Sequence, residues 1–198
     1  PSHVAICWDM GKATFRNAMY TSYKQNRPAP PEELIPQFDY VKDISEQFGF
    51  VNIGVANYEA DDVIGTLAKI YSKDNEVHIV TGDRDILQCI NEQVEVWLIR
   101  KGFNIYHHYT LNRFNEEYAL HPLQLIDIKA FMGDSADGYP GVKGIGEKTA
   151  IKLIQSYGSV ENVLDHIESL TPGQQKKIAT DKENLILSKQ LAEIYTDV

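Results

Sequence analysis

The sequence is poor in cysteine and has no long apolar run. Its two cysteines, Cys7 and Cys89, stand far apart in apolar surroundings. No segment approaches the length of a membrane span, and no secretory apolar region opens the chain. These absences favour a cytoplasmic protein with buried, reduced thiols and no membrane partner. The 198 residues, 43% of them hydrophobic, suffice for a sizeable core.

Acidic side chains are also absent from residues 10–31, which contain Lys12, Arg16, Lys24 and Arg27. The net charge of −9 would, taken alone, argue against nucleic acid as a partner. The acids are clustered elsewhere, however, and the basic segment stands apart from them. This separation favours a protein that binds a polyanion partly through metal ions.

Apolar runs alternate with helical patterns up to about residue 110. Strands are expected at 3–9, 51–56, 76–81 and 94–100, and helices at 32–49, 58–73 and within 82–90. Beyond that point helical patterns follow one another at 113–119, 122–133, 147–158, 160–167, 174–179 and 182–195. The sequence therefore predicts an α/β domain with a mostly parallel sheet over residues 1–110, followed by a helical domain over 111–198.

Carboxylates occur where the predicted strands end and where the helical part begins. They are Asp9, Glu59, Asp61, Asp62, Asp83, Asp85, Asp134 and Asp137. The carboxyl ends of parallel strands share one edge of a sheet, so we expect these groups to converge. Oxygen ligands without a Cys or His pattern select Mg²⁺ or Mn²⁺, and two such ions suit phosphodiester cleavage. Taken singly, each acid is more simply a solvated residue, or a first-turn charge behind an N-cap such as Asn57.

A glycine hairpin is expected at residues 141–148, "GVKGIGEK". Gly144 and Gly146 allow a tight turn that leaves backbone N–H groups open to an anion at a helix start. Lys143 and Lys148 lie beside it, as in helix–hairpin–helix elements that hold duplex phosphates. Such hairpins can also bind K⁺ on loop carbonyls. The alternative is an ordinary glycine turn between two helices.

The basic segment 14–27 combines aromatic and cationic side chains. If it is helical, Arg16, Tyr20, Tyr23, Lys24 and Arg27 recur at helical spacing, which suits single-stranded nucleic acid. An amphipathic helix whose aromatics pack on the core is the competing interpretation, and the lack of acids favours nucleic acid. The adjacent residues His107 and His108 are expected to have a structural role and not to bind a metal, because adjacent residues of a strand point to opposite faces.

Four stretches carry a family resemblance: "CWDMGKATFRNAMYTSYKQNRPAPPEEL", "YEADDVIGTLA", "VTGDRDILQCI" and "IDIKAFMGDSADGYPGVKGIGEKTAIKLI". Together they resemble the bacterial 5′–3′ exonuclease family. Its members are structure-specific flap endonucleases, similar to the 5′-nuclease domain of DNA polymerase I. The resemblance covers nearly the whole chain and suggests the free-standing form. It implies a PIN-like domain with a helical arch at about 12–35 and a helix–three-turn–helix module. The implied activity is Mg²⁺-dependent hydrolysis at 5′ flaps or 5′ ends of DNA, in replication and repair.

The resemblance also implies residue roles. All eight carboxylates take metal-ligand positions, with Asp83 and Asp85 at the catalytic centre. Lys24 and Arg27 match arch residues that contact the scissile phosphate, and the hairpin glycines match the duplex-binding turn. Two departures stand out: the family has a further strand ending in a metal-ligand Asp, whose counterpart would precede Pro1, and Gly138 replaces an expected Asn.

Two other functions fit parts of the pattern. One is a catalytically inactive module that binds branched DNA. The other is a PIN-type ribonuclease, although small enzymes of that kind generally lack the hairpin. The chain is expected to act as a monomer close to the bacterial nucleoid.

Overall fold

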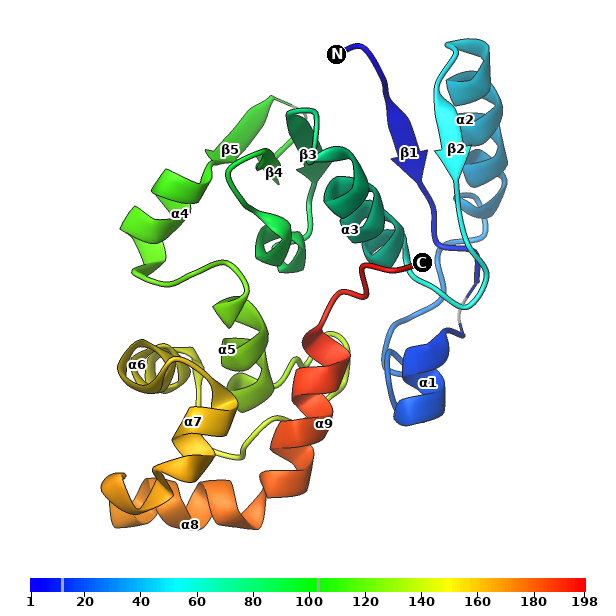
Figure 1. The fold of residues 1–198 in the computed structure, drawn as a ribbon. Helices are drawn as coiled ribbons and strands as arrows, with labels where there is room; N and C mark the ends of the chain where they lie inside the picture. The colour runs from blue at the N-terminus through cyan, green and yellow to red at the C-terminus, as the bar shows by residue number, and fades with distance from the viewer. Residues whose placement is uncertain (12, 103) are drawn as a thin grey trace.

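The computed structural model describes residues 1–11, 13–102 and 104–198, and it places the strands of the N-terminal part in two small sheets (Figure 1). In the first sheet β1 (Ala5–Cys7) runs parallel to β2 (Val51–Ile53). In the second, β3 (Val77–Thr81) runs parallel to β4 (Val94–Lys101), and β5 (Ile105–Tyr109) is antiparallel to β4. The prediction of mostly parallel pairing is confirmed.

The expectation of one continuous sheet is wrong for the described residues, because no hydrogen-bonded ladder joins β1 to β3. Helix α3 (Ala60–Tyr71) connects the two sheets instead, since it packs on β1 and on β3. Its N-cap is Glu59 rather than the predicted Asn57, which takes a left-handed conformation with φ of 73°. Two of its acids, Asp61 and Asp62, nevertheless lie in the first turn, as predicted.

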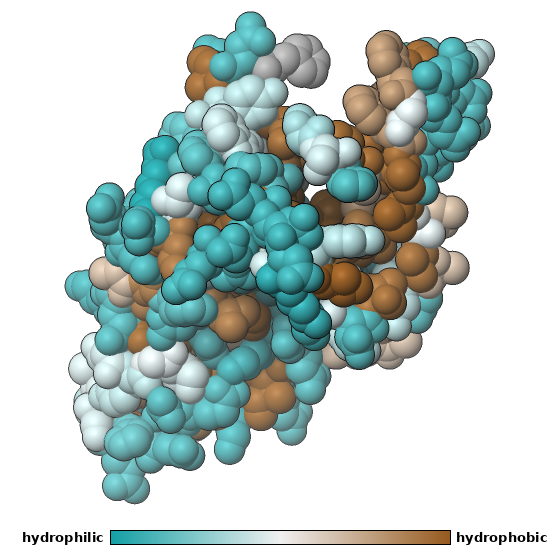
Figure 2. All heavy atoms as spheres, turned by 45° about the horizontal axis from the view of Figure 1, so that its top comes forward, coloured by the Kyte–Doolittle hydropathy of each residue, from teal (hydrophilic) through white to brown (hydrophobic). Residues whose placement is uncertain are grey.

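Helix α2 (Ile35–Gln47) forms where predicted, but its apolar residues are not covered. Phe38, Ile44 and Phe48 are exposed, Phe48 by 74%. Figure 2 shows hydrophobic side chains gathered on the side of the molecule formed by α2 and its neighbouring strands. The helical spacing therefore predicted the helix correctly, and the described residues leave several of its apolar side chains uncovered.

The helical interpretation of residues 14–27 holds only at their start. Helix α1 (Phe15–Met19) covers only that part, and turns follow up to residue 26. Lys24 has a φ of 56°, in the left-handed region, so the right-handed helix cannot continue through this residue. Lys12, the first residue of the predicted arch, lies outside the described residues.

The C-terminal part is helical, as predicted, and packs around one core with the second sheet. Its helices are α4 (Leu111–Tyr118), α5 (Gln124–Met132), α6 (Glu147–Tyr157), α7 (Val160–Asp165), α8 (Pro172–Thr180) and α9 (Lys182–Ala192), with a short 3₁₀ turn η2 (Ile167–Ser169). Phe114, Phe131 and Ile154 are fully buried in this core, together with Leu98 of β4. No helix among the described residues combines the length and the apolar character needed to cross a membrane.

The loop after α5 folds back on the end of that helix. Gly133 has a φ of 69° and Gly141 a φ of 60°, and a Cβ on Gly141 would lie 2.2 Å from the Gly133 nitrogen. The Val142 N–H donates to the Phe131 carbonyl at 2.8 Å. Glycine at both positions thus lets the two ends of the loop meet.

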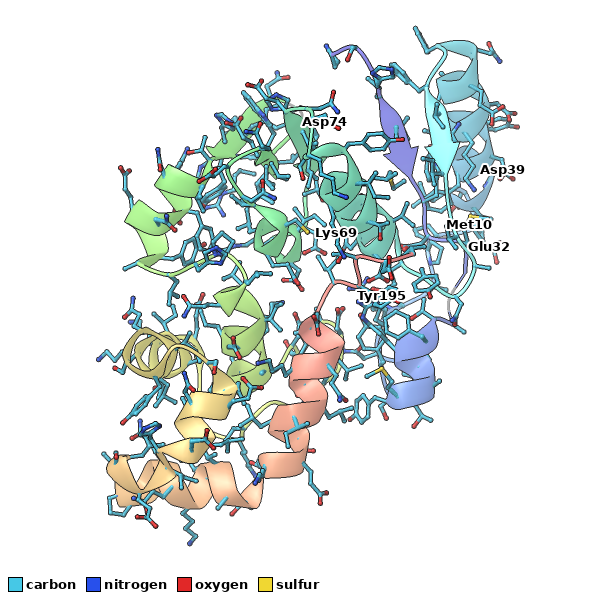
Figure 3. All side chains as sticks on the ribbon, viewed as in Figure 1. Met10, Glu32, Asp39, Lys69, Asp74 and Tyr195 are labelled. Atoms are coloured by element: carbon cyan, nitrogen blue, oxygen red, sulfur yellow. The ribbon has the colours of Figure 1, made fainter. Side chains whose placement is uncertain are left out.

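The C-terminal segment crosses α3 and is fixed there by side chains. The Ile194 N–H donates to Gln88 of η1 (Asp85–Cys89) at 3.0 Å, and the Tyr195 N–H donates to Asp62 at 2.9 Å. Figure 3 shows Tyr195 between α3 and α1, where it stacks on Tyr58 and meets the edge of Phe15. This segment therefore joins α1, α3 and α9.

Candidate active site

A cleft between α3, the loop after β3 and the loop after α5 collects most of the predicted carboxylates. Its lining includes Glu59, Asp61, Asp83, Asp85 and Asp137, with basic and aromatic residues of the segment 16–24 on one wall. The acids come from three separate stretches of sequence. Their convergence in the fold is what the positions at strand ends predicted.

Three carboxylates form the tightest group. Asp85 begins η1, while Asp134 and Asp137 follow α5, and one oxygen of each lies within 4.8 Å of the others. The Asp134 side chain accepts N–H bonds from Ala136 and Asp137, at 2.7 and 3.1 Å, which fixes its orientation. We call these three residues the Asp85 cluster.

Lys129 of α5 lies against the Asp85 cluster. Its Nζ is 2.7 Å from Asp85 Oδ1 and also donates to Asp134. Burial raises the pKa of Asp85 and Lys129 opposes that effect. For Asp134 burial acts in the same direction, but the ammonium and the backbone N–H groups of Asp137 and Ala136 together outweigh it, so the pKa of this carboxyl is lowered. The lysine therefore helps to keep Asp134 ionised.

A second group of acids lies beside the first. Burial and the neighbouring charges of Asp83 and Glu59 raise the pKa of Asp61 to about 7. The Asp83 side chain accepts the Asp85 N–H at 2.9 Å, so the two groups are adjacent. Glu59 accepts from Lys24 at 2.8 Å and from the Tyr23 hydroxyl at 3.2 Å. The raised pKa of Asp61 among other carboxylates fits a site for divalent cations, because a cation would remove the repulsion.

Asp9 lies at the rim of this group. Its side chain accepts the Ala60 N–H at 2.8 Å and so caps the start of α3. Its charge contributes, weakly, to the raised pKa of Asp61. The structure thus brings Asp9 close to the second group of acids but gives it a helix-capping role as well.

Asp62 does not fit the predicted role of a metal ligand. It is fully buried, and its two oxygens accept from Arg16 at 2.7 and 2.8 Å as well as from the backbone N–H groups of Glu59 and Tyr195. The same contacts correct the expectation that Arg16 touches DNA, because only 3% of its surface is exposed. The two residues form a structural ion pair.

The other predicted DNA contacts of the basic segment divide into exposed and buried groups. Arg27 is half-exposed and pairs with Asp137, and Lys24 pairs with Glu59 at the edge of the cleft. Tyr20 is partly buried. Tyr23 is buried against Tyr139, with its hydroxyl on Glu59, so in this structure it has no face free for a base.

The glycine hairpin lies at the start of α6, as predicted, with Gly146 as its N-cap. The N–H groups of Glu147 and Lys148, the first two of α6, make no hydrogen bond inside the described part of the chain, whereas that of Thr149 donates to the Gly146 carbonyl at 3.0 Å. Lys143 and Lys148 are exposed beside them. The Gly144 carbonyl, which a potassium ion could use, accepts from Lys177 at 2.9 Å. The hairpin is thus open to an anion.

Comparison with known families covers the whole chain in two parts. The family model of the 5′–3′ exonuclease N-terminal, resolvase-like domain matches residues 1–119. The family model of the 5′–3′ exonuclease C-terminal SAM fold matches residues 120–198.

The chain belongs to the 5′–3′ exonuclease family. The resemblance seen in its sequence motifs is thereby confirmed, as are the fold class and the nuclease class of the enzyme. Among relatives of this exonuclease family, a 5′–3′ exonuclease of Bacillus subtilis (strain 168) is 52% identical over 198 residues, which are all of this chain and 67% of that protein. A DNA polymerase I of Lactococcus lactis subsp. lactis is 43% identical over 99% of this chain and 23% of its own length.

Solved structures of similar fold come from bacteriophage T5. The T5 D15 protein co-crystallised with metal ions superposes with a TM-score of 0.79 at 26% identity, over 95% of this chain and 74% of that one. A variant of the T5 D15 flap endonuclease, in a pseudo-enzyme-product complex with DNA and metal ions, has the same TM-score of 0.79 at 24% identity, over 95% of this chain and 72% of that one. The second likeness supports the fold of this exonuclease.

Sequence reasoning missed Lys129 and Tyr139. Both lie in the last of the four stretches that carry the family resemblance. A signal for Lys129 was available, since it is a charged residue in the apolar helix "LIDIKAFM", five positions before Asp134. Tyr139 gave no signal, because its role depends on packing against Tyr23, which is distant in sequence.

Proposed function

We propose that this exonuclease hydrolyses DNA phosphodiester bonds at 5′ flaps or 5′ ends with two divalent cations, Mg²⁺ or Mn²⁺. The observation that carries the proposal is the convergence of Glu59, Asp61, Asp83 and the Asp85 cluster on one cleft beside a cationic segment. The all-oxygen donor set fits hard cations. When bound, such ions supply Lewis-acid stabilisation of a phosphate and lower the pKa of coordinated water.

The cation sites would be held by two sets of residues. The Asp85 cluster would hold one ion, and Glu59, Asp61 and Asp83, with Asp9 at their rim, would hold the other. The raised pKa of Asp61 supports this division, since its neighbours leave negative charge uncompensated at that place.

Lys24 and Arg27 would hold the scissile phosphate. Both already lie at the cleft, where they pair with Glu59 and Asp137 through charge-assisted bonds. A phosphate that entered beside the carboxylates would contact the side chains of both Lys24 and Arg27. Their positive charges would stabilise the negative charge that develops on the phosphate. Tyr20 would stack on a base of the single strand, and Tyr23 would have to leave its buried position to do the same.

The hairpin would bind the duplex on the other side of the junction. Its open N–H groups and the side chains of Lys143 and Lys148 suit phosphate contacts that read no base. A potassium ion on the loop carbonyls would have to displace Lys177 from Gly144 or use other carbonyls. We assign nuclease chemistry to residues 1–110 together with Asp134 and Asp137, and duplex binding to the rest of residues 111–198.

The DNA complex of the T5 neighbour supports DNA as the partner of this exonuclease, and the proposed hairpin and arch contacts support a preference for flaps. We propose that it works as a monomer, since every group assigned to the site comes from one chain. Its bacterial relatives support a place in the cytoplasm, near the nucleoid.

The test is a Mg²⁺ titration on a labelled 5′-flap duplex, with a matched single-stranded RNA as the competing substrate. Asp83→Asn should abolish cleavage and leave junction binding intact, while Asp74→Asn, at an exposed site distant from the cleft, should cleave normally. Cleavage of the RNA alone would make the protein a ribonuclease. Binding of the flap without any cleavage would make it an inactive module.

A further inference from the structure

We propose that Lys129 is the resident counter-ion of the Asp85 cluster, and that a divalent cation enters the cluster by displacing its ammonium group. The inference rests on the proposed function, because it takes the cluster as a cation site. It adds a residue that sets how tightly the cation binds. Lys129 itself is then a positioning residue for two of the three carboxylates.

The contacts of Lys129 are those of a bound cation. Its Nζ lies 2.7 and 2.9 Å from the two oxygens of Asp85 and also contacts Asp134. The three side chains are each about a fifth exposed, at 23%, 24% and 17%. An ammonium group bridging two partly buried carboxylates occupies oxygens that a metal ion would need.

Charge balance supports displacement rather than coexistence. The cluster carries three negative charges, of which Lys129 compensates one and Arg27, through its ion pair with Asp137, another. One negative charge is left, so a divalent ion added beside both basic side chains would make the site positive. A divalent ion requires shorter bonds to the same oxygens, about 2.1 Å for Mg²⁺, and repels an ammonium group nearby. The lysine side chain has several rotatable bonds and is partly exposed, so its ammonium group can move away from the carboxylates into the cleft.

A second lysine, Lys189, also bridges two carboxylates but, among the described residues, does not lie beside a group of three acids. It is on α9, with Nζ 2.7 Å from Asp127 and 2.7 Å from Glu161, and its side chain is 27% exposed. The only cation-sized group of three acids found among the described residues is the Asp85 cluster. Lys189 therefore joins helices, and it is the natural control.

The first experiment measures Mn²⁺ binding to the whole chain without DNA, by titration calorimetry and electron paramagnetic resonance. Asp134→Asn identifies the binding event that belongs to the cluster. Lys129→Met should bind that ion about tenfold more tightly than the wild type, because a nearby positive charge is removed. Lys129→Arg and Lys189→Met should stay within about threefold of the wild type. An unchanged or weaker affinity in folded Lys129→Met would overturn the proposal.

The second experiment needs no substitution and covers the case in which Lys129→Met does not fold. Wild-type protein is pulsed with acetic anhydride with and without Mn²⁺, and acetylated peptides are quantified by mass spectrometry. Acetylation of Lys129 should rise several-fold with Mn²⁺, while that of Lys189 stays constant. A Lys129 rate that is unchanged or lower, with Mn²⁺ bound, overturns the inference alone. Absence of Mn²⁺ binding in both the wild type and Lys129→Met overturns the metal site of the proposed function, and the inference with it.

Discussion

Arg16 and Asp62 form a buried bidentate ion pair, with Nη1 2.8 Å from Oδ2 and Nη2 2.7 Å from Oδ1. The same guanidinium donates to the Leu191 and Glu193 carbonyls at 3.2 and 2.7 Å. One side chain thus ties α1 to α3 and to the segment after α9. The basic segment is anchored by this contact at its start, while Lys24 and Arg27 further along remain at the cleft.

Removing one partner of this pair should destabilise the fold. We expect Arg16→Met or Asp62→Asn to lower the free energy of unfolding by about 3–5 kcal/mol, because the remaining charge is buried without compensation. Urea denaturation measures the loss, and Lys189→Met serves as a control at a more exposed pair. A loss below about 1 kcal/mol would mean that the pair is solvated in solution.

Gly141 and Gly146 should differ sharply in how well they tolerate substitution by alanine. Gly141→Ala would combine a φ of 60° with a Cβ 2.2 Å from the Gly133 nitrogen, so we expect at least about 3 kcal/mol of destabilisation. Gly146→Ala has an ordinary φ of −97° and nothing within 4 Å of the new Cβ, so it should cost about 1 kcal/mol or less. Thermal unfolding compares the two, and equal stabilities would show that the loop can rearrange.

Lys24 should contribute to the chemical step more than to affinity. We expect Lys24→Met to lower the single-turnover rate on a 5′-flap duplex by about 10²–10³-fold, since it removes a cation beside the developing phosphate charge. The dissociation constant for duplex should change little, because the hairpin is untouched. Lys73→Met, at an exposed lysine outside the cleft, is the control. A loss confined to affinity would assign Lys24 to binding alone.

Alkaline pH should destabilise this exonuclease through its thiols. Burial raises the pKa of Cys7 to about 11 and of Cys89 to about 12, with Asp61 adding to both. Raised values mean that the folded state holds protons that the unfolded state releases from about pH 9, so stability falls as pH increases above that value. Urea midpoints between pH 8 and 10.5 measure the decline, which should be smaller in a Cys7→Ala, Cys89→Ala variant. Both thiols should resist iodoacetamide at pH 8.

The elements of the fold followed from local patterns, and the contacts between distant segments did not. The end of a predicted strand gave the positions of Asp83 and Asp85, and the spacing of glycines gave the position of the hairpin. Strand ends and glycine spacing can both be recognised within a short stretch of sequence. Residues 14–27 are helical only at their start, since helical spacing does not report the left-handed turn at Lys24. Arg16 and Asp62 carry the charges of a DNA contact and a metal ligand, and only their burial against each other shows otherwise.

The apolar spacing of α2 predicted the helix, yet Phe38 within it and Phe48 at its end are exposed. Periodicity identifies an apolar face but does not say which part of a structure covers it. Lys129 shows the converse limit: a lysine in an apolar helix signals a polar contact, but its sequence does not name Asp85, which lies 44 positions earlier, as one of the partners.

Helix α5 presents Lys129 to the Asp85 cluster, and the hairpin is fastened to its last turn through Phe131 and Val142. The helix is short, and Asp127, which accepts the Val160 N–H at 3.0 Å, locks it against α7. This helix joins the proposed duplex-binding hairpin to the proposed cation site, and would hold the two at a fixed distance. The position of the cut, counted in nucleotides from the junction, should therefore be set by the protein rather than by the sequence of the DNA.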